Sequence, residues 1–321
     1  MFGCVWLMKA LCVSLHVSHG YVGNRACTFP LQYQGWDVDA VSTTNFSNHP
    51  GYGKIGGRVV DPDQVQQVIE GLGGIVDVTL EYDMVISGYC PRPETVEVVR
   101  KFCAELKPLV ALVVDPVLGD NGKLYVQETI VPEYERLMVE CPVSLTTPNL
   151  FEFELLSKCK VNSWTDLKRA MNTFYEKFHI PNVVILSIDI EGQLYAVGAL
   201  RELQVKTQKL TSDNSNLREP EERDGLAIFY FPIEKLDCNF NGSGDVLTAI
   251  VSHCFYKNGC KLTPETLSEA LTKLEHILKK SIQIEAQKTG KQVTHVKDIQ
   301  IIALRAVLDM NPTMRPVFWV Q

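Results

Sequence analysis

The stretch Leu109-Val110-Ala111-Leu112-Val113-Val114 is an uninterrupted apolar run, and the polar motif Asp115-Pro116-Val117-Leu118-Gly119-Asp120 follows it directly. A continuous apolar run of this length indicates a strand that is buried on both faces, as in a parallel sheet. Parallel sheets of this kind carry helices on both sides. The stretch therefore predicts an α/β fold with a polar motif where the strand ends.

Strand-like and helix-like segments alternate on both sides of this run. The other segments expected as strands are 11–17, 38–43, 84–87, 143–146 and 183–187, with 193–197 and 226–231 as later, antiparallel strands. The segments expected as helices are 21–34, 62–70 with Asp61 as N-cap, 94–106, 133–139, 149–157, 164–178 with Ser163 as N-cap, 244–257 and 264–287. This order predicts a central, mostly parallel sheet flanked by helices on both faces.

The length of 321 residues allows one large domain or two small ones. We expect a single domain over residues 1–321, with a core at about 9–289 and a tail at 290–321 that packs irregularly. The polar stretch Thr207–Asp224 has little periodicity. We expect it to be a loop within the domain, because another polar motif lies beyond it.

Composition narrows the class of protein. The net charge of −7 argues against a nucleic-acid partner, because phosphate backbones require clustered Lys and Arg. The ten cysteines form no Cys-x-x-Cys pair, which is typical of reduced thiols in a cytosolic protein. Residues 1–17 lack the basic start of a signal peptide, and no run approaches a membrane span. We expect a cytoplasmic location, with the nucleus left open, and no membrane contact.

The stretch Gly242-Ser243-Gly244-Asp245 precedes an apolar helix and predicts an anion site at the helix N-terminus. Glycines let the backbone approach a ligand, and the first helical amides have no internal partner. The Asp245 carboxylate is suited to removing a proton from a hydroxyl that attacks a phosphate. A plain N-cap, where Ser and Asp are favoured, is the alternative.

We expect the glycine stretch at 242–245 to follow a strand directly, and further polar motifs follow the other expected strands. They are Gly20-Tyr21-Val22-Gly23-Asn24, Asn45-Phe46-Ser47-Asn48-His49-Pro50-Gly51-Tyr52, Ser87-Gly88-Tyr89, Asp115-Pro116-Val117-Leu118-Gly119-Asp120 and Thr147-Pro148-Asn149-Leu150-Phe151-Glu152. The ends of parallel strands line one edge of an open α/β sheet, which is where ligands bind. Together these motifs predict a ligand site at that edge.

In these motifs the chain closely resembles the pyridoxal kinases of the ribokinase superfamily. The similarity runs from about Leu11 to Gln287, and the motifs in combination are specific to that family. The resemblance implies a ribokinase-like fold and transfer of the γ-phosphate of ATP to the 5′-hydroxyl of pyridoxal, pyridoxine or pyridoxamine. It also implies Mg²⁺ or another divalent cation, activation by K⁺ or Na⁺, and a homodimer.

The resemblance assigns roles to individual residues. Asp245 is the expected general base, with the amides of Gly242, Ser243 and Gly244 stabilising developing charge. The expected cation ligands are Asp120 and Glu152 for Mg²⁺, and Asp115 with Thr147 for the monovalent cation. The expected ATP contacts are Asp115, Asn149, Leu150, Phe151, Glu152, Leu186, Ser187, Leu236, Asp237, Cys238 and Ser243. The expected vitamin contacts are Leu15, Pro50, Tyr89 and Asp245, and Tyr125 lies where the family has an active-site lid.

Each assignment has a structural alternative. Asp115-Pro116 could simply end a strand, Glu152 could be an exposed residue in a first helical turn, and Asp120-Asn121-Gly122 could be an ordinary turn.

The chain also departs from the family pattern. Leu15 stands where most members have Ser, Pro50 where many have Thr, Ser243 where Thr is usual, and Leu186 replaces a hydroxyl residue. Leu15 and Pro50 motivate a rival hypothesis, a superfamily kinase acting on hydroxymethylpyrimidine or an altered vitamer. A second rival is a non-catalytic vitamin-binding protein of the same fold, although it would have no need of the Asp245, Asp120 and Glu152 carboxylates.

Overall fold

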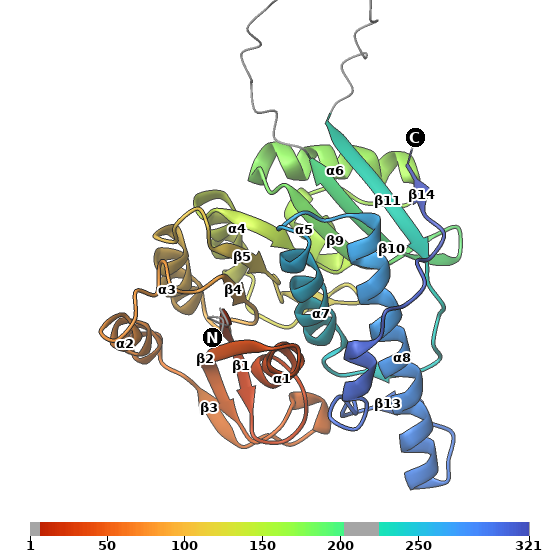
Figure 1. Ribbon diagram of the computed structural model, residues 1–321, viewed down its shortest axis with the longest axis horizontal. Coiled ribbons are helices and arrows are strands. Elements are labelled where there is room, and N and C mark those ends of the chain that lie inside the picture. Colours follow the sequence, from red (N-terminus) through yellow and green to blue (C-terminus); the bar gives the residue numbers. More distant parts are fainter. Residues whose placement is uncertain (1–6, 202–224, 321) are drawn as a thin grey trace, which may run out of the picture.

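The computed structural model describes residues 7–201 and 225–320, and a ten-stranded sheet runs through its centre (Figure 1). The strand order is β14-β11-β10-β9-β8-β5-β4-β1-β2-β3. The strands are β1 (Met8–Val17), β2 (Trp36–Phe46), β3 (Gly57–Val59), β4 (Met84–Ser87), β5 (Ala111–Val114), β8 (Val143–Thr146), β9 (Asn182–Ile190), β10 (Gln193–Arg201), β11 (Leu226–Pro232) and β14 (Phe318–Trp319). The polar stretch Thr207–Asp224 lies outside the described residues.

The central part of the sheet is parallel, as predicted. Strands β2, β1, β4, β5, β8 and β9 run parallel, whereas β10, β11, β14 and β3 pair antiparallel. Strand β5 begins at Ala111, two residues after the start of the apolar run at Leu109. The first two residues of the run belong to a turn, because the amide of Val110 donates to the Lys107 carbonyl. Every residue of β5 is buried, as expected for a strand covered on both faces.

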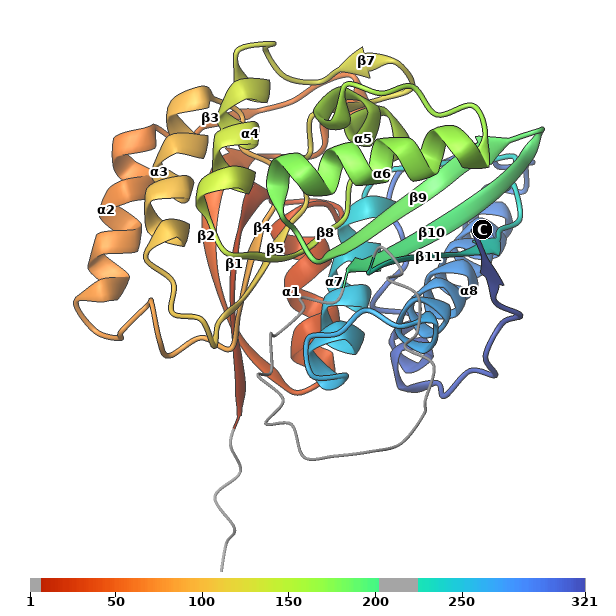
Figure 2. The ribbon, with the colours of Figure 1, turned by 90° about the horizontal axis from the view of Figure 1, so that it is seen from above.

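Helices cover both faces of the sheet (Figure 2). One face carries α1 (Asn24–Tyr33), α7 (Ser243–Lys257) and α8 (Pro264–Thr289); the other carries α2 (Pro62–Gly73), α3 (Pro93–Ala104), α4 (Ile130–Glu140), α5 (Leu150–Ser157) and α6 (Trp164–Phe178). Alternate residues of β5 enter two separate cores: Leu112 and Val114 pack on the α2–α6 side, and Ala111 and Val113 on the α1, α7 and α8 side. The predicted fold class is confirmed.

Local sequence sets where these helices begin. The side chains of Asp61 and Ser163 accept hydrogen bonds from Asp63 and Asp166, so both predicted N-caps are confirmed. The cysteines in the described residues are free and mostly buried. Within residues 7–201 and 225–320, no helix has both the length and the apolar character needed to cross a membrane.

The C-terminal stretch differs from the expected irregular tail. Two of its short strands join sheets: β13 (His295–Val296) pairs in parallel with β12 (Asn239–Phe240), and β14 pairs with β11 at the sheet edge. A 3-10 helix, η2 (Arg305–Asp309), contacts α1 and α8 between them. Two-residue strands carry no periodic signal, so the sequence pattern could not reveal them.

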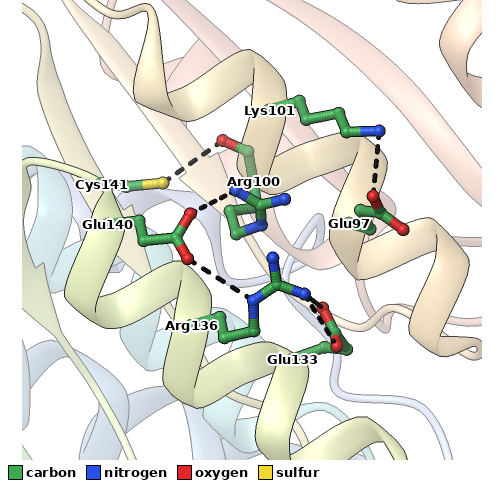
Figure 3. Close-up of polar contacts among 7 residues, drawn as sticks. All are labelled: Glu97, Arg100, Lys101, Glu133, Arg136, Glu140 and Cys141. Atoms are coloured by element: carbon green, nitrogen blue, oxygen red, sulfur yellow. Dashed lines mark hydrogen bonds and ion pairs between the residues drawn. The ribbon is translucent and has the colours of Figure 1, made fainter.

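A polar network joins α3 to α4 on one face (Figure 3). The guanidinium of Arg100, only 11% exposed, pairs with Glu140, whose other oxygen lies 3.5 Å from Arg136 Nε. The Cys141 thiol donates to the Arg100 carbonyl at 3.4 Å. Arg100 therefore depends on Glu140 for neutralisation of its charge.

Replacing Glu140 with Ala is expected to lower the free energy of unfolding by about 1–3 kcal/mol, because it leaves the buried Arg100 charge without its partner. Urea denaturation measures the loss. The matched control is Glu97→Ala, which removes an exposed pair with Lys101 on the same helix and should leave the midpoint nearly unchanged. Equal shifts in the two variants would contradict this account.

Candidate active site

The polar motifs predicted for one edge of the sheet do gather there. Those at Gly20, Asn45, Ser87, Asp115 and Thr147 follow or close the strands β1, β2, β4, β5 and β8, which all run in one direction. The glycine motif at 242–245 differs, because it follows the short strand β12 and not a strand of the central sheet. It reaches the same edge because α7 packs against α1.

Two glycines allow the loops at this edge to touch. Gly242 has φ 84° and caps α7, and a Cβ there would lie 2.2 Å from the Tyr21 carbonyl oxygen. Gly23 has φ 51°, and a Cβ there would lie 2.5 Å from Leu15 Cγ. Side chains at these two positions would push the Gly20–Asn24 loop away from the glycine loop and from β1.

Asp245 lies in the first turn of α7 and is half-buried. Burial raises the pKa of its carboxyl group to about 6, and a hydrogen bond from the Gly23 amide opposes this rise. The carboxylate is therefore charged at neutral pH yet basic enough to accept a proton. Its position places it beside the exposed first amides of a helix, where anions are stabilised.

Asp115 is buried near Asp245 and is linked to two threonines. The Thr248 hydroxyl donates to Asp115 Oδ2 at 3.0 Å and lies 2.9 Å from the Thr147 hydroxyl. Burial, and then the charge of Asp245, raise the pKa of Asp115 to about 7. The sequence motifs point to Asp115 and Thr147, whereas Thr248, which connects them, lies within an apolar helix and carries no motif of its own.

Glu152 is 3% exposed, so the reading of it as an exposed first-turn residue is wrong. Its Oε1 accepts from the amides of Leu118 at 2.8 Å and Gly119 at 3.2 Å, and its Oε2 accepts from the Asn149 amide at 2.9 Å. Burial and the charge of Asp115 raise the pKa of Glu152, although the three amides oppose this shift. Glu152 therefore clamps the Asp115–Asp120 motif onto the start of α5.

Asp120 occupies an exposed hairpin between β6 (Gly119–Asp120) and β7 (Lys123–Leu124). Asn121 and Gly122 form its turn, with φ 51° and 75°, so the turn interpretation is correct. The Asp120 carboxylate accepts hydrogen bonds only from Asn121 among the contacts of the described residues. It remains open to a ligand.

The carboxylates at this edge are suited to a cation that is bound jointly by the protein and by the phosphates of a nucleotide. Burial together with repulsion between Asp115 and its neighbours Asp245 and Glu152 raises the pKa of Asp115 and Glu152, and a cation nearby would relieve both effects. No group of three or more His, Cys, Asp or Glu side chains in the described part of the chain could hold a metal alone. Mg²⁺ commonly takes one or two carboxylates and completes its shell with water and phosphate oxygens. The donor set fits that mode.

Asp120→Asn is expected to raise the Mg²⁺ concentration needed for half-maximal activity, because it removes an exposed charged oxygen ligand, without changing the melting temperature. Glu152→Gln is expected to lower the free energy of unfolding by about 1–3 kcal/mol, because an amide cannot accept all three backbone bonds. Mg²⁺ titrations and thermal melts of both variants separate the two roles. If Asp120→Asn showed the same Mg²⁺ dependence as the parent protein, Asp120 would not be a metal ligand and would serve only to form the turn.

Apart from Asp115 and Ser243, the residues expected to contact ATP come from three segments. Asn149 donates to the Gly119 carbonyl at 2.7 Å and forms an isolated bridge with Leu186. Ser187 is exposed and has φ 61°, at an irregularity where β9 loses its regular pairing with β10. A non-glycine residue in this conformation is strained, which is a recurrent feature of ligand contacts. Leu150 and Phe151 start α5. Leu236, Asp237 and Cys238 lie in the segment before β12, where the Cys238 amide bonds to the Leu236 carbonyl.

The residues expected to contact the vitamin come from the other side of the edge. Leu15 is half-buried against Gly23, where the β1–β2 register shifts. Tyr89 is half-buried and held through its backbone by Ser14 and Thr43. Pro50 begins an exposed turn of 3-10 helix, η1 (Pro50–Tyr52). Tyr125 is 62% exposed, and its pKa is raised by partial burial and by the charges of Asp120 and Glu152, so it lies near both.

A separate surface hollow of about 810 Å³ lies among the N-termini of α2, α3 and α4. Its lining includes Asp61, Arg92 and Thr129, which precede those helices, and none of the glycine-loop residues. We therefore place the candidate active site at the glycine loop and not in this hollow.

Comparisons with known proteins match this chain to vitamin-related small-molecule kinases, as a family model and as individual relatives. The family model described as phosphomethylpyrimidine kinase matches residues 56–297. Pyridoxal kinase of Homo sapiens is 33% identical over 294 residues, which cover 89% of each chain. A putative pyridoxal kinase of Saccharomyces cerevisiae is 31% identical over 318 residues, which cover 95% of each chain.

Solved structures agree with the sequence relatives. Pyridoxal kinase from Leishmania donovani in complex with ADP and pyridoxamine superimposes with a TM-score of 0.81 at 27% identity, covering 98% of this chain and 99% of that one. The same enzyme in complex with ADP and pyridoxine gives a TM-score of 0.79 at 25% identity, over the same shares of both chains. With relatives above 30% identity along most of its length and the ribokinase-like architecture throughout, this chain is a kinase that belongs to the pyridoxal kinase family.

Proposed function

We propose that this chain transfers the γ-phosphate of ATP to the 5′-hydroxyl of pyridoxal, and also of pyridoxine and pyridoxamine. The observation that carries the proposal is the Asp245 carboxylate, which lies in the first turn of α7 beside the glycine loop with a pKa raised to about 6. The ligands bound by the similar Leishmania donovani enzyme, ADP with pyridoxamine or pyridoxine, support this choice of substrates.

Asp245 acts as the general base in this proposal. It accepts the proton of the substrate hydroxyl as that oxygen attacks the γ-phosphate, and the Gly23 amide holds the carboxylate in place. The first amides of α7, from Gly242 to Gly244, stabilise the charge that develops on the phosphoryl group. Asn149 and Ser187 orient the phosphates from the opposite side of the edge.

Cations complete the site. Mg²⁺ would neutralise the charge on the phosphates; Asp120 would hold it, and Glu152 would keep the Asp115–Asp120 motif in place for it. Asp115 and the Thr147 and Thr248 hydroxyls are hard oxygen donors suited to K⁺ or Na⁺. That cation would also offset the repulsion between Asp115 and Asp245.

A substrate panel tests the proposal. Purified protein is incubated with ATP and Mg²⁺ together with pyridoxal, pyridoxine, pyridoxamine or hydroxymethylpyrimidine, and ADP and the phosphorylated product are quantified by chromatography. We expect 5′-phosphates of the vitamers as the main products. Preference for hydroxymethylpyrimidine would establish the rival kinase, and tight pyridoxal binding without ADP formation would establish a non-catalytic binder.

A further inference from the structure

The C-terminal segment Thr294–Asp298 lies directly against the glycine loop. The Asn239 amide donates to the Thr294 carbonyl at 2.9 Å, and the Asn241 amide to the Val296 carbonyl at 3.3 Å. The side chain of Asn241 is held at both ends: its Nδ2 donates to the Lys297 carbonyl at 3.3 Å, and its Oδ1 lies 3.1 Å from His295 Nε2. The residue immediately before Gly242 is therefore fixed by this segment.

Asp298 extends the same segment to the substrate side of the edge. The Tyr52 hydroxyl donates to Asp298 Oδ2, and His19 Nε2 lies 3.4 Å from that oxygen. The Nζ of Lys297 stands 4.8 Å from the centre of the Tyr52 ring. Tyr52 closes the η1 turn that begins at Pro50. One carboxylate thus links the loop after β1, the loop after β2 and the C-terminal segment.

The surroundings of Asp298 indicate that this link is built in and not a chance surface contact. Asp298 Oδ1 is buried without a hydrogen-bond partner, which is costly for a carboxylate oxygen. Gly20, with φ 94°, allows the carboxylate to approach, since a Cβ there would lie 2.5 Å from Oδ1. Gly51 in the η1 turn also lies close to Asn241, the residue before the glycine loop, since a Cβ at Gly51 would lie 3.3 Å from Asn241 Nδ2.

We propose that Asp298 is a positioning residue that sets the affinity for the alcohol substrate. Its carboxylate holds Tyr52, and the segment Thr294–Asp298 holds Asn241, so the turn that begins at Pro50 is kept against the glycine loop. The inference rests on the proposed function for the identity of that substrate. The expected ATP contacts lie on α5, β9, the segment before β12, the Asp115 motif and Ser243 of the glycine loop, and Asp298 touches none of these residues among the described contacts. The effect should therefore fall on one substrate only.

The chain offers a matched control for this pair. The Tyr33 hydroxyl donates to Asp309 Oδ2 at 2.8 Å and likewise ties the C-terminal stretch to the body of the protein, but through α1 and η2. Asp298→Ala and Tyr52→Phe are expected to raise the KM for pyridoxal by about 10-fold each while the KM for ATP changes by less than about twofold. The double variant should be little worse than Asp298→Ala alone, because Tyr52→Phe removes a contact that Asp298→Ala already removes. Asp309→Asn should leave both KM values unchanged.

A substrate-independent measurement separates this inference from the proposed function. Amide hydrogen exchange of residues 49–53 and 239–245 should accelerate in Asp298→Ala and not in Asp309→Asn. If the parent protein phosphorylates no vitamer, the proposed function fails while the exchange data still decide whether Asp298 orders the two loops. Unchanged exchange, or equal increases in the KM for pyridoxal and for ATP, would overturn the positioning role.

Discussion

Asp245→Asn is expected to lower turnover by about 10²–10⁴-fold, because an amide cannot accept the proton of the attacking hydroxyl. The substitution keeps the size of the side chain and its place in the first turn of α7, so ADP and pyridoxal should bind as in the parent. Steady-state kinetics and calorimetry on the same preparation test both parts. Near-parent turnover in the folded variant would remove Asp245 from the mechanism.

The matched control is Asp166→Asn. Asp166 occupies the same place in α6 that Asp245 occupies in α7, three residues after the cap, but lies on a surface helix away from the edge. Its substitution should leave turnover unchanged.

In the parent, turnover should fall as the pH drops below about 6, because protonation of Asp245 removes the base. That acidic limb should be missing in Asp245→Asn.

Leu15→Ser combined with Pro50→Thr is expected to tighten pyridoxal binding by about 10- to 100-fold, because two added hydroxyls supply hydrogen bonds of about 0.5–1.5 kcal/mol each. Leu15 packs on Gly23, whose amide holds Asp245, and Pro50 starts the turn that ends at Tyr52. Both positions therefore belong to segments that we expect to face the vitamin. Kinetics with pyridoxal and ATP varied separately, checked by calorimetry, measure the change.

The KM for ATP is the internal control for this double variant, since neither Leu15 nor Pro50 is among the expected nucleotide contacts. The single variants show whether the serine or the threonine contributes more. Unchanged or weaker pyridoxal binding would mean that this pocket is shaped for another substrate, and the hydroxymethylpyrimidine kinase would then become the better hypothesis.

Periodicity and motifs predicted most of the fold. The strands at 84–87 and 143–146 and the helix at 164–178 coincide with the observed elements. Three consecutive apolar residues mark the first, alternation of apolar and polar residues marks the second, and the Ser163 cap marks the start of the helix. The edge strands were not predictable in this way. Strands β3, β13 and β14 are two or three residues long, and their pairing depends on partners far away in the sequence.

In the candidate site, too, some residues have a local sequence signal and others depend on contacts with distant parts of the chain. Asp115, Asp245 and Thr147 were identified because each stands in a motif, but what connects them is a hydroxyl on the apolar helix α7, that of Thr248. Asp298 gives no local signal either, since its importance lies in a contact with Tyr52, 246 positions earlier. Glu152 stands in a motif as well, and its bond to the Asn149 amide belongs to a local capping box, but its burial and its bonds to the Leu118 and Gly119 amides follow from the packing of α5 against the β6 hairpin.

The pairing of β13 with β12 has a consequence for how the protein is made. A ribosome releases β1 early, and that strand occupies an interior position of the sheet, whereas residues 294–319 emerge only after every other strand. Until they do, β11 is an open sheet edge and the glycine loop lacks the segment that fixes Asn241. Open edges invite pairing with other chains. The nascent protein therefore carries Asp245 for some time before the glycine loop is completed, and chains interrupted before residue 294 should be inactive and prone to aggregate.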